Sequence, residues 1–109
     1  MRSIAFKAEI PYFAYLDAAG KPLSGLPVFA TDPDIMIPLY KGMVLTRVVD
    51  ERAVAMQRTG RLGTYASALG QEAVGVGTAS AMQAEDVLVP GFRDQAAMLW
   101  RGVSISEHL

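Results

Sequence analysis

An arginine stands in this sequence where it could bind an anion. A β-branched run over residues 87–89 breaks at Pro90-Gly91, and Arg93 follows directly before a segment of helical pattern. The first turn of a helix offers free backbone N–H groups and the positive end of the macrodipole, and a guanidinium can hold a phosphate through two hydrogen bonds. An ion pair with Asp94 or Asp86 explains the same spacing equally well. The spacing leaves both interpretations open.

Other side chains that could do chemistry have simpler explanations. Glu72 falls in the first turn of a predicted helix, where a carboxylate complements the dipole, and no histidine, second carboxylate or metal ligand stands at matching spacing. Capping is therefore favoured over catalysis. Spacing alone favours Phe92 as a core residue, and Arg58 and Arg61 flank Gly60 as solvated residues at a helix end. No catalytic residue and no metal ligand is predicted.

The first element that must position these residues is a long helix. Apolar residues recur every three to four positions between Thr31 and Gly60, at Leu39, Met43, Val44, Val48, Val54 and Ala55. Asp32 or Asp34 is the expected N-cap, and Pro38 falls in the first turn. Gly60 is a natural stop. We expect this helix to present its apolar residues to a core.

A charge cluster lies within this helix. Arg47 precedes Asp50 and Glu51 by three and four residues, the spacing at which side chains meet on a helix surface. We expect a solvated outer face, in which each pair contributes a few tenths of a kcal/mol.

Three shorter elements are predicted after Gly60. A helix over residues 71–82 is followed by a strand at 87–89 and by a helix over residues 94–101 that Gly102 closes. Ser104 and Glu107 then form a capping box, which opens a further helix, and the sequence ends two residues after Glu107. We therefore expect this chain to be the N-terminal part of a longer protein.

Glycines within the 71–82 helix need an explanation. Gly75 and Gly77 each cost a helix interior roughly 1 kcal/mol relative to alanine. Ala73, Gly77 and Ala81 recur at every fourth position and form a ridge that another helix can approach closely. Packing within the chain and packing against a second subunit explain the ridge equally well.

The first 31 residues differ from the rest. An aromatic, strand-prone run from Phe6 to Leu16 ends in a turn signal at residues 17–20, and prolines and glycines interrupt residues 21–31. We predict an extended arm with a hairpin over residues 1–31 and a mainly helical part over residues 32–109.

Composition narrows the class of protein. Ten basic residues against eleven acidic ones leave a net charge of −1, so nothing favours nucleic acid or an acidic membrane surface as partner. The absence of cysteine excludes a disulfide scaffold, a thiolate metal site and a cysteine nucleophile. It also agrees with a cytoplasmic location, which we expect. No apolar run approaches the roughly 20 residues that span a bilayer.

A set of motifs between residues 34 and 109 recurs in one known family. The matching positions are Tyr40, Met43, Arg47, Asp50, residues 57–65, 70–73, 76–77, Asp86, Pro90, residues 92–94 and 101–102. Through them the chain resembles the start of the alpha subunit of thiamine-diphosphate-dependent 2-oxo acid dehydrogenases, and bacterial pyruvate dehydrogenases in particular.

The resemblance implies a fold and a reaction. The parent family has a doubly wound α/β fold around a parallel sheet, of which this chain would be the mainly helical N-terminal portion. The implied reaction is oxidative decarboxylation of a 2-oxo acid with acyl transfer to a lipoyl group on an acyltransferase component. The site would lie between alpha and beta subunits of an α2β2 heterotetramer. Gln71 and residues 63–65 lean towards pyruvate as substrate.

The resemblance also implies roles for four residues. Arg93 matches the family arginine that contacts the cofactor diphosphate, and Phe92 stands where many relatives carry tyrosine, so it can line the cofactor pocket but lacks the hydroxyl. Tyr65 and Ala66 would be walls of the substrate pocket, Ala66 standing where some relatives have histidine. The magnesium ligands belong to a Gly-Asp-Gly to Asn segment that this sequence does not contain.

Two alternatives remain open from the sequence. A non-catalytic fragment could keep the interaction surface of the alpha subunit and bind no cofactor. A small helical module unrelated to the family could use the Ala73, Gly77 and Ala81 ridge to bind a partner helix.

Overall fold

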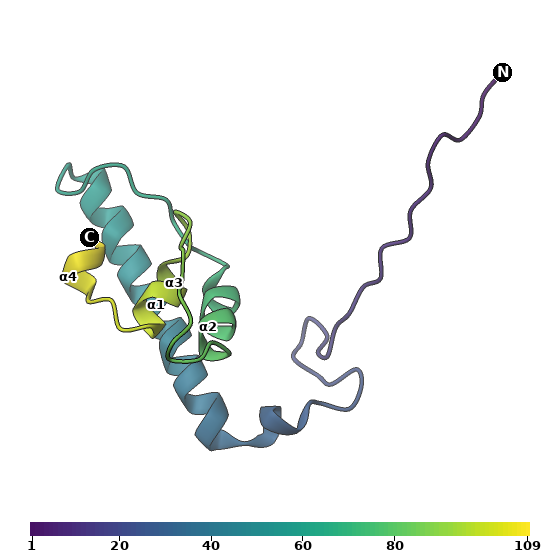
Figure 1. Ribbon diagram of the computed structural model, residues 1–109, viewed down its shortest axis with the longest axis horizontal. Coiled ribbons are helices and arrows are strands. Elements are labelled where there is room, and N and C mark those ends of the chain that lie inside the picture. Colours follow the sequence, from purple (N-terminus) through teal and green to yellow (C-terminus); the bar gives the residue numbers. More distant parts are fainter.

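The computed structural model describes residues 1–109 and contains helices but no strand. Its elements are the 3-10 helix η1 (Val28–Thr31) and the α-helices α1 (Pro33–Arg58), α2 (Glu72–Ser80), α3 (Gln95–Trp100) and α4 (Ile105–His108). In Figure 1, α2 and α3 pack beside the long α1, and the N-terminal arm leads away from all of them. The mainly helical character predicted for this chain is confirmed, and the structure contains no sheet.

Helix α1 begins where the sequence indicates. The Asp32 side chain accepts a hydrogen bond from the Asp34 N–H at 2.9 Å, and Gly60, with φ +72°, follows the helix end. The placement of Pro38 in the first turn was wrong. Because Asp32 caps the helix and Pro33 occupies its first position, Pro38 lies one turn further inside.

The inner face of α1 is more polar than the apolar spacing predicts. Its buried residues are Thr46, Val49, Asp50 and Ala53, which recur at three-to-four-residue spacing. Val48 is 57% exposed although it belongs to the predicted apolar set. The helix carries apolar residues on two faces, and the other helices cover only one of them.

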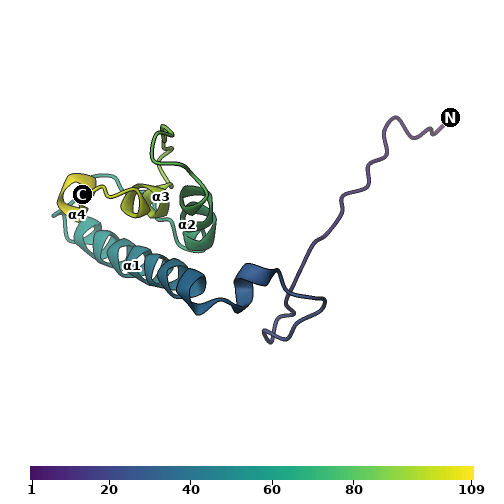
Figure 2. The same ribbon diagram turned by 60° about the horizontal axis from the view of Figure 1, so that its bottom comes forward.

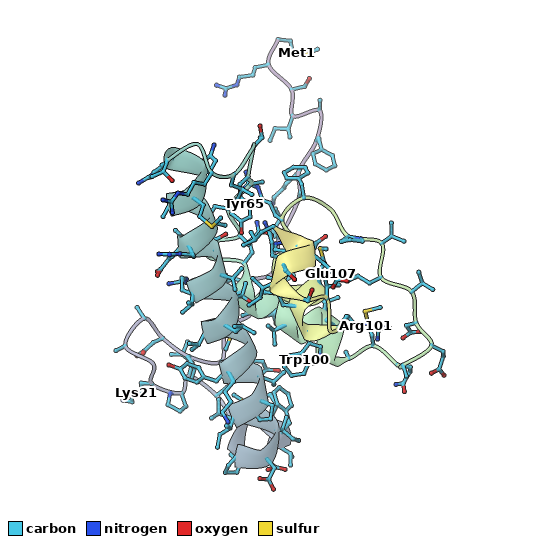
Figure 3. The ribbon with its side chains drawn as sticks, turned by 90° about the vertical axis from the view of Figure 1, so that its left-hand side faces the viewer. Met1, Lys21, Tyr65, Trp100, Arg101 and Glu107 are labelled. Atoms are coloured by element: carbon cyan, nitrogen blue, oxygen red, sulfur yellow. The ribbon has the colours of Figure 1, made fainter.

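Glycines let the three main helices approach closely. A Cβ on Gly75 would lie 2.6 Å from the Cβ of Ala96 in α3, and one on Gly42 would lie 2.9 Å from the Trp100 ring. Trp100 accordingly lies against α1 in Figure 3. Gly75 is thus explained by packing within the chain.

The predicted small-residue ridge faces away from this packing. A Cβ on Gly77 would meet nothing within 4 Å, and Ala73, Gly77 and Ala81 are all exposed. Internal packing of the ridge is therefore ruled out, and Gly75, Val76 and Ala79 form the buried side of α2 instead.

The strand predicted at residues 87–89 was wrong. Val87 is 83% and Val89 is 87% exposed, and no segment pairs with them. Strand backbone needs a neighbour for its N–H and C=O groups, and β-propensity over three residues cannot supply one. The preceding turn is held instead by Arg101, labelled in Figure 3, whose guanidinium donates to backbone oxygens of residues 83, 84 and 86.

The helices after the turn follow the prediction closely. Helix α3 is shorter than predicted, at six residues, and Gly102 closes it with φ +93°. The capping box is confirmed, because the Ser104 hydroxyl accepts from the Glu107 N–H and the Glu107 carboxylate accepts from the Ser104 N–H. The Ser104 hydroxyl, and after it the Ser104 N–H, donates to the Glu107 carboxylate, and these two hydrogen bonds lower the pKa of Glu107.

The N-terminal arm makes a turn but few other contacts. One bridge pairs Leu16 with Pro22 around Gly20, whose φ is +79°, so the predicted hairpin is confirmed as a single tight turn. Residues 1–13 are exposed throughout. Figure 2, a second view, also shows the arm extending clear of the helices.

The molecule exposes much of its surface. Its accessible area is 8679 Å², whereas about 5900 Å² is typical of a compact protein of this mass. Its radius of gyration is 18.2 Å, against about 13 Å for a compact chain of this length. None of the helices combines the length and the apolar character that a membrane crossing requires.

Candidate functional site

Asp50 ties the loop over residues 65–68 to the middle of α1. Its Oδ1 accepts hydrogen bonds from the Tyr65 hydroxyl at 2.9 Å and from the Ala68 N–H at 2.7 Å, and its Oδ2 accepts from the Ser67 hydroxyl at 2.6 Å. Asp50 is only 3% exposed. Its predicted place in a solvated cluster with Arg47 was wrong, because the incoming loop covers this side of the helix.

The same loop is held from its other side by the start of α3. The Gln95 side-chain amide donates to the Ala66 carbonyl at 2.6 Å and to the Phe92 carbonyl at 3.3 Å, and the Arg93 guanidinium donates to the Ser67 carbonyl. The loop therefore connects α1 to α3 through polar contacts. It brings together Tyr65, Ala66 and Arg93, three of the four predicted site residues.

Arg93 is exposed and forms no ion pair. Asp94 accepts from the Gly91 N–H at 2.6 Å and Asp86 from the Gln83 N–H at 2.7 Å, so neither carboxylate pairs with the arginine. The ion-pair interpretation of Arg93 is thereby ruled out. The predicted help from a helix dipole is small, because α3 has only six residues.

Phe92 lies beside the guanidinium and not in the core. The Arg93 Cζ is 5.5 Å from the centre of the Phe92 ring, and Phe92 is 79% exposed. Interpretation of Phe92 as a core residue was therefore wrong. An exposed aromatic ring beside a cation gives the two side chains a shared apolar and cationic surface.

Tyr65 and Ala66 contribute to this site through different groups. Tyr65 lies beside α1 in Figure 3, and its hydroxyl is directed to Asp50. Burial, and after it the hydrogen bond to Asp50, raises the pKa of Tyr65 to about 12, so the phenol is neutral at physiological pH. Ala66 holds the loop by its carbonyl and offers only a methyl group to any ligand.

A second polar contact joins α1 to α2. The Arg47 Nε donates to the Glu72 Oε1 at 2.5 Å, which raises the pKa of Arg47 and lowers that of Glu72. Glu72 stands in the first turn of α2 as predicted, but its carboxylate serves this pair, so capping was an incomplete explanation. The pair lines a groove of about 360 Å³ together with Tyr40, Val44 and Val48.

No metal centre is formed by these side chains. Nowhere do three or more histidine, cysteine, aspartate or glutamate residues come together in a way that could hold a metal ion. Asp50 accepts from three donors of the loop and belongs to no such cluster.

The motifs on α1, α2 and the loop now have a family context. The family described as Dehydrogenase E1 component matches residues 40–109, which includes α1 from Tyr40 onwards and every residue of the site. The chain belongs to this family. The resemblance to alpha subunits is confirmed by relatives with that name that are 31–39% identical to this chain.

Three relatives illustrate the range of this E1 family. The pyruvate dehydrogenase E1 component subunit alpha of Bacillus subtilis is 35% identical over 93% of this chain and 27% of its own length. The corresponding subunit of Staphylococcus aureus is 39% identical over 66% of this chain and 20% of its own. The mitochondrial 2-oxoisovalerate dehydrogenase subunit alpha 2 of Arabidopsis thaliana is 31% identical over 93% and 21%.

The chain thus spans about a quarter of the length of these relatives. No solved structure matches it significantly. Sequence reasoning named Arg93, Phe92, Tyr65 and Ala66 as candidates, and their roles stay predictions. It did not foresee that Asp50 and Gln95 bind the loop that carries Tyr65 and Ala66. Asp50 stands directly after two valines, Val48 and Val49, and this apolar flank was the one signal of its burial.

Proposed function

We propose that this chain forms part of the alpha subunit of a thiamine-diphosphate-dependent 2-oxo acid dehydrogenase. The observation that carries the proposal is the family match over residues 40–109, which contains an exposed, unpaired Arg93 beside Phe92. The subunit would take part in oxidative decarboxylation of a 2-oxo acid with acyl transfer to a lipoyl group. Bound thiamine diphosphate would supply the electron sink for decarboxylation. The protein would orient the cofactor and supply charge that complements it.

Arg93 suits a diphosphate. Its guanidinium carries five N–H donors, and the only oxygen that accepts from them is the Ser67 carbonyl, so donors remain for phosphate oxygens. Phe92 would supply an apolar wall without a hydroxyl. Magnesium has no cluster of ligands in this chain, so we propose that its ligands come from elsewhere in the enzyme.

Substrate and partners follow from the same proposal. Gln71 and residues 63–65 favour pyruvate as the substrate, and Tyr65 and Ala66 would be walls of its pocket. Relatives named for pyruvate and for 2-oxoisovalerate both match, so this preference rests on the residues alone. The partners would be a beta subunit in an α2β2 heterotetramer and a lipoyl acyltransferase, in the cytoplasm.

The arginine role can be tested by substitution. In the assembled alpha–beta complex that carries this sequence, R93Q should raise the Kd for thiamine diphosphate about 10- to 100-fold, because a charge-assisted contact is lost. R2Q is the matched control, because Arg2 is exposed in the N-terminal arm, which extends clear of the helices and of the loop. Equal affinity of R93Q and wild type by calorimetry would refute the diphosphate contact.

The proposal that most of the cofactor site lies outside these 109 residues gives a second test. The isolated 109-residue chain should show no saturable binding of thiamine diphosphate with magnesium, because Arg93 is its one candidate contact to the diphosphate. A clear micromolar isotherm by calorimetry would contradict the proposal that most of the site lies outside this chain.

A non-catalytic role is the second candidate. The exposed Ala73, Gly77 and Ala81 ridge favours it, because small residues on a helix surface allow close approach of a partner. The module unrelated to the family is excluded by the family match. Decarboxylation of pyruvate by the assembled complex would exclude the non-catalytic role as well.

A further inference from the structure

Asp50 is a buried carboxylate that the proposed function does not use. It is 3% exposed, and the one ion pair of the structure joins Arg47 to Glu72, so no cation pairs with it. A buried carboxylate is costly unless hydrogen bonds compensate it. Three donors do so here, and all three belong to residues 65–68.

A short chain of contacts leads from Asp50 to Arg93. Ser67 takes part in both ends of it, because its hydroxyl donates to the Asp50 Oδ2 while its carbonyl accepts from the Arg93 guanidinium. The direction of that carbonyl depends on the conformation of the loop, which lies outside any helix and is tied to α1 by Asp50. The orientation of an otherwise exposed arginine is therefore set two contacts away.

We infer that Asp50 is a positioning residue for Arg93 and acts through the loop over residues 65–68. The inference rests on the proposed function in one respect, the role of Arg93 as a diphosphate contact. Asp50 holds the loop by the placement of its acceptor atoms, since each hydrogen bond that it accepts comes from a neutral donor.

Asparagine should therefore replace Asp50 with little loss. Its Oδ1 can accept from Tyr65 and Ala68 as the carboxylate does. Its Nδ2 can donate to the Ser67 hydroxyl oxygen, which now accepts only from the Leu69 N–H and has a second lone pair. Alanine offers none of these contacts.

The test compares D50A and D50N with E51A, a control that removes a neighbouring exposed carboxylate from the same helix. In D50A, amide exchange of Ala68 should accelerate about tenfold or more, and the pKa of Tyr65 should fall from about 12 towards the ordinary value near 10. The guanidinium NMR signals of Arg93 should move to solvent-exposed positions. D50N and E51A should keep the wild-type exchange rate and arginine signals.

Two results would overturn the inference. One is a D50A variant that keeps the wild-type amide exchange rate at Ala68 and the wild-type Arg93 signals. The other is a D50N variant in which exchange at Ala68 accelerates and the Arg93 signals move, while circular dichroism shows intact helices. If D50A does not fold, the double variant Y65F/S67A removes two of the three donors, and unchanged Arg93 signals there would have the same force. No cofactor enters these measurements, so their failure leaves the affinity test of R93Q untouched.

Discussion

At the scale of single residues, Arg47 and Glu72 form the ion pair that joins α1 to α2. The pair is asymmetric, because the Glu72 side chain is 9% exposed while the Arg47 side chain is 47% exposed. The carboxylate therefore depends on the guanidinium for its charge compensation, and its lowered pKa follows chiefly from that hydrogen bond. A buried glutamate held ionised in this way makes stability depend on pH.

The variant E72Q should be less stable than wild type at neutral pH, and the difference should shrink in acid. The folded-state pKa of Glu72 lies below its ordinary value of 4.5, so its contribution is complete above 4.5 and is lost as the pH falls through the lowered value. Thermal unfolding midpoints between about pH 3 and pH 7 measure this. E85Q, at an exposed position with no ion pair, is the control. A difference that does not change with pH would contradict the pairing.

At the scale of one element, helix α2 contains two glycines in opposite surroundings. Gly75 faces α3 and leaves no room for a side chain, whereas Gly77 faces open space two residues later. Both lie inside the helix with ordinary backbone angles, since neither has a positive φ. Their intrinsic cost to the helix is the same, so packing alone separates them.

Alanine substitutions should therefore act in opposite directions. G75A should destabilise the fold by about 1–3 kcal/mol, because the new Cβ would lie 2.6 Å from that of Ala96 and 3.0 Å from the Ala97 nitrogen. G77A should stabilise it by about 0.5–1 kcal/mol through helix propensity and a less flexible unfolded chain. Urea unfolding of the two variants measures both changes, and shifts of the same sign would refute this account of α2.

The molecule as a whole is an open set of helices with a detached arm. Twelve of 109 residues are buried, and they are contributed by α1, α2, α3 and the loop that reaches Ala68. Residues 1–13 take part in no backbone hydrogen bond, and aromatic residues such as Phe6 and Tyr12 are largely exposed. Residues 1–13 are therefore energetically separate from the helical core.

Deletion of residues 1–13 should leave the stability of the helical part within about 0.5 kcal/mol of the full chain, because no packing or hydrogen bond is lost. Chemical denaturation followed by circular dichroism near 222 nm, a signal dominated by the helices, measures it. A drop of 2 kcal/mol or so would mean that the arm packs on the helices in solution.

Local chemistry made several features of this protein predictable. Asp32, the Ser104–Glu107 capping box, Gly60 and Gly102 act on backbone groups within a few residues of themselves, so the bounds of α1 and the ends of the later helices could be inferred directly. The family could be inferred as well, because its motifs are contiguous short patterns. Arg93 was named as a candidate by the same route, and its role stays a prediction.

Contacts between distant segments were beyond local patterns. Arg47 has carboxylates at three and four residues' distance, yet its partner is Glu72, 25 residues away. Val87 to Val89 have strand propensity, yet they lack a neighbouring strand.

The sequence by itself determined where helices begin and end and which family the chain belongs to, because both depend on residues close together in the chain. Only the tertiary structure decided that Asp50 is buried beneath the 65–68 loop and that Gly75, not Gly77, allows close packing. The physical reason is that burial depends on which face of a helix another segment covers, and helical spacing offers two faces without choosing between them.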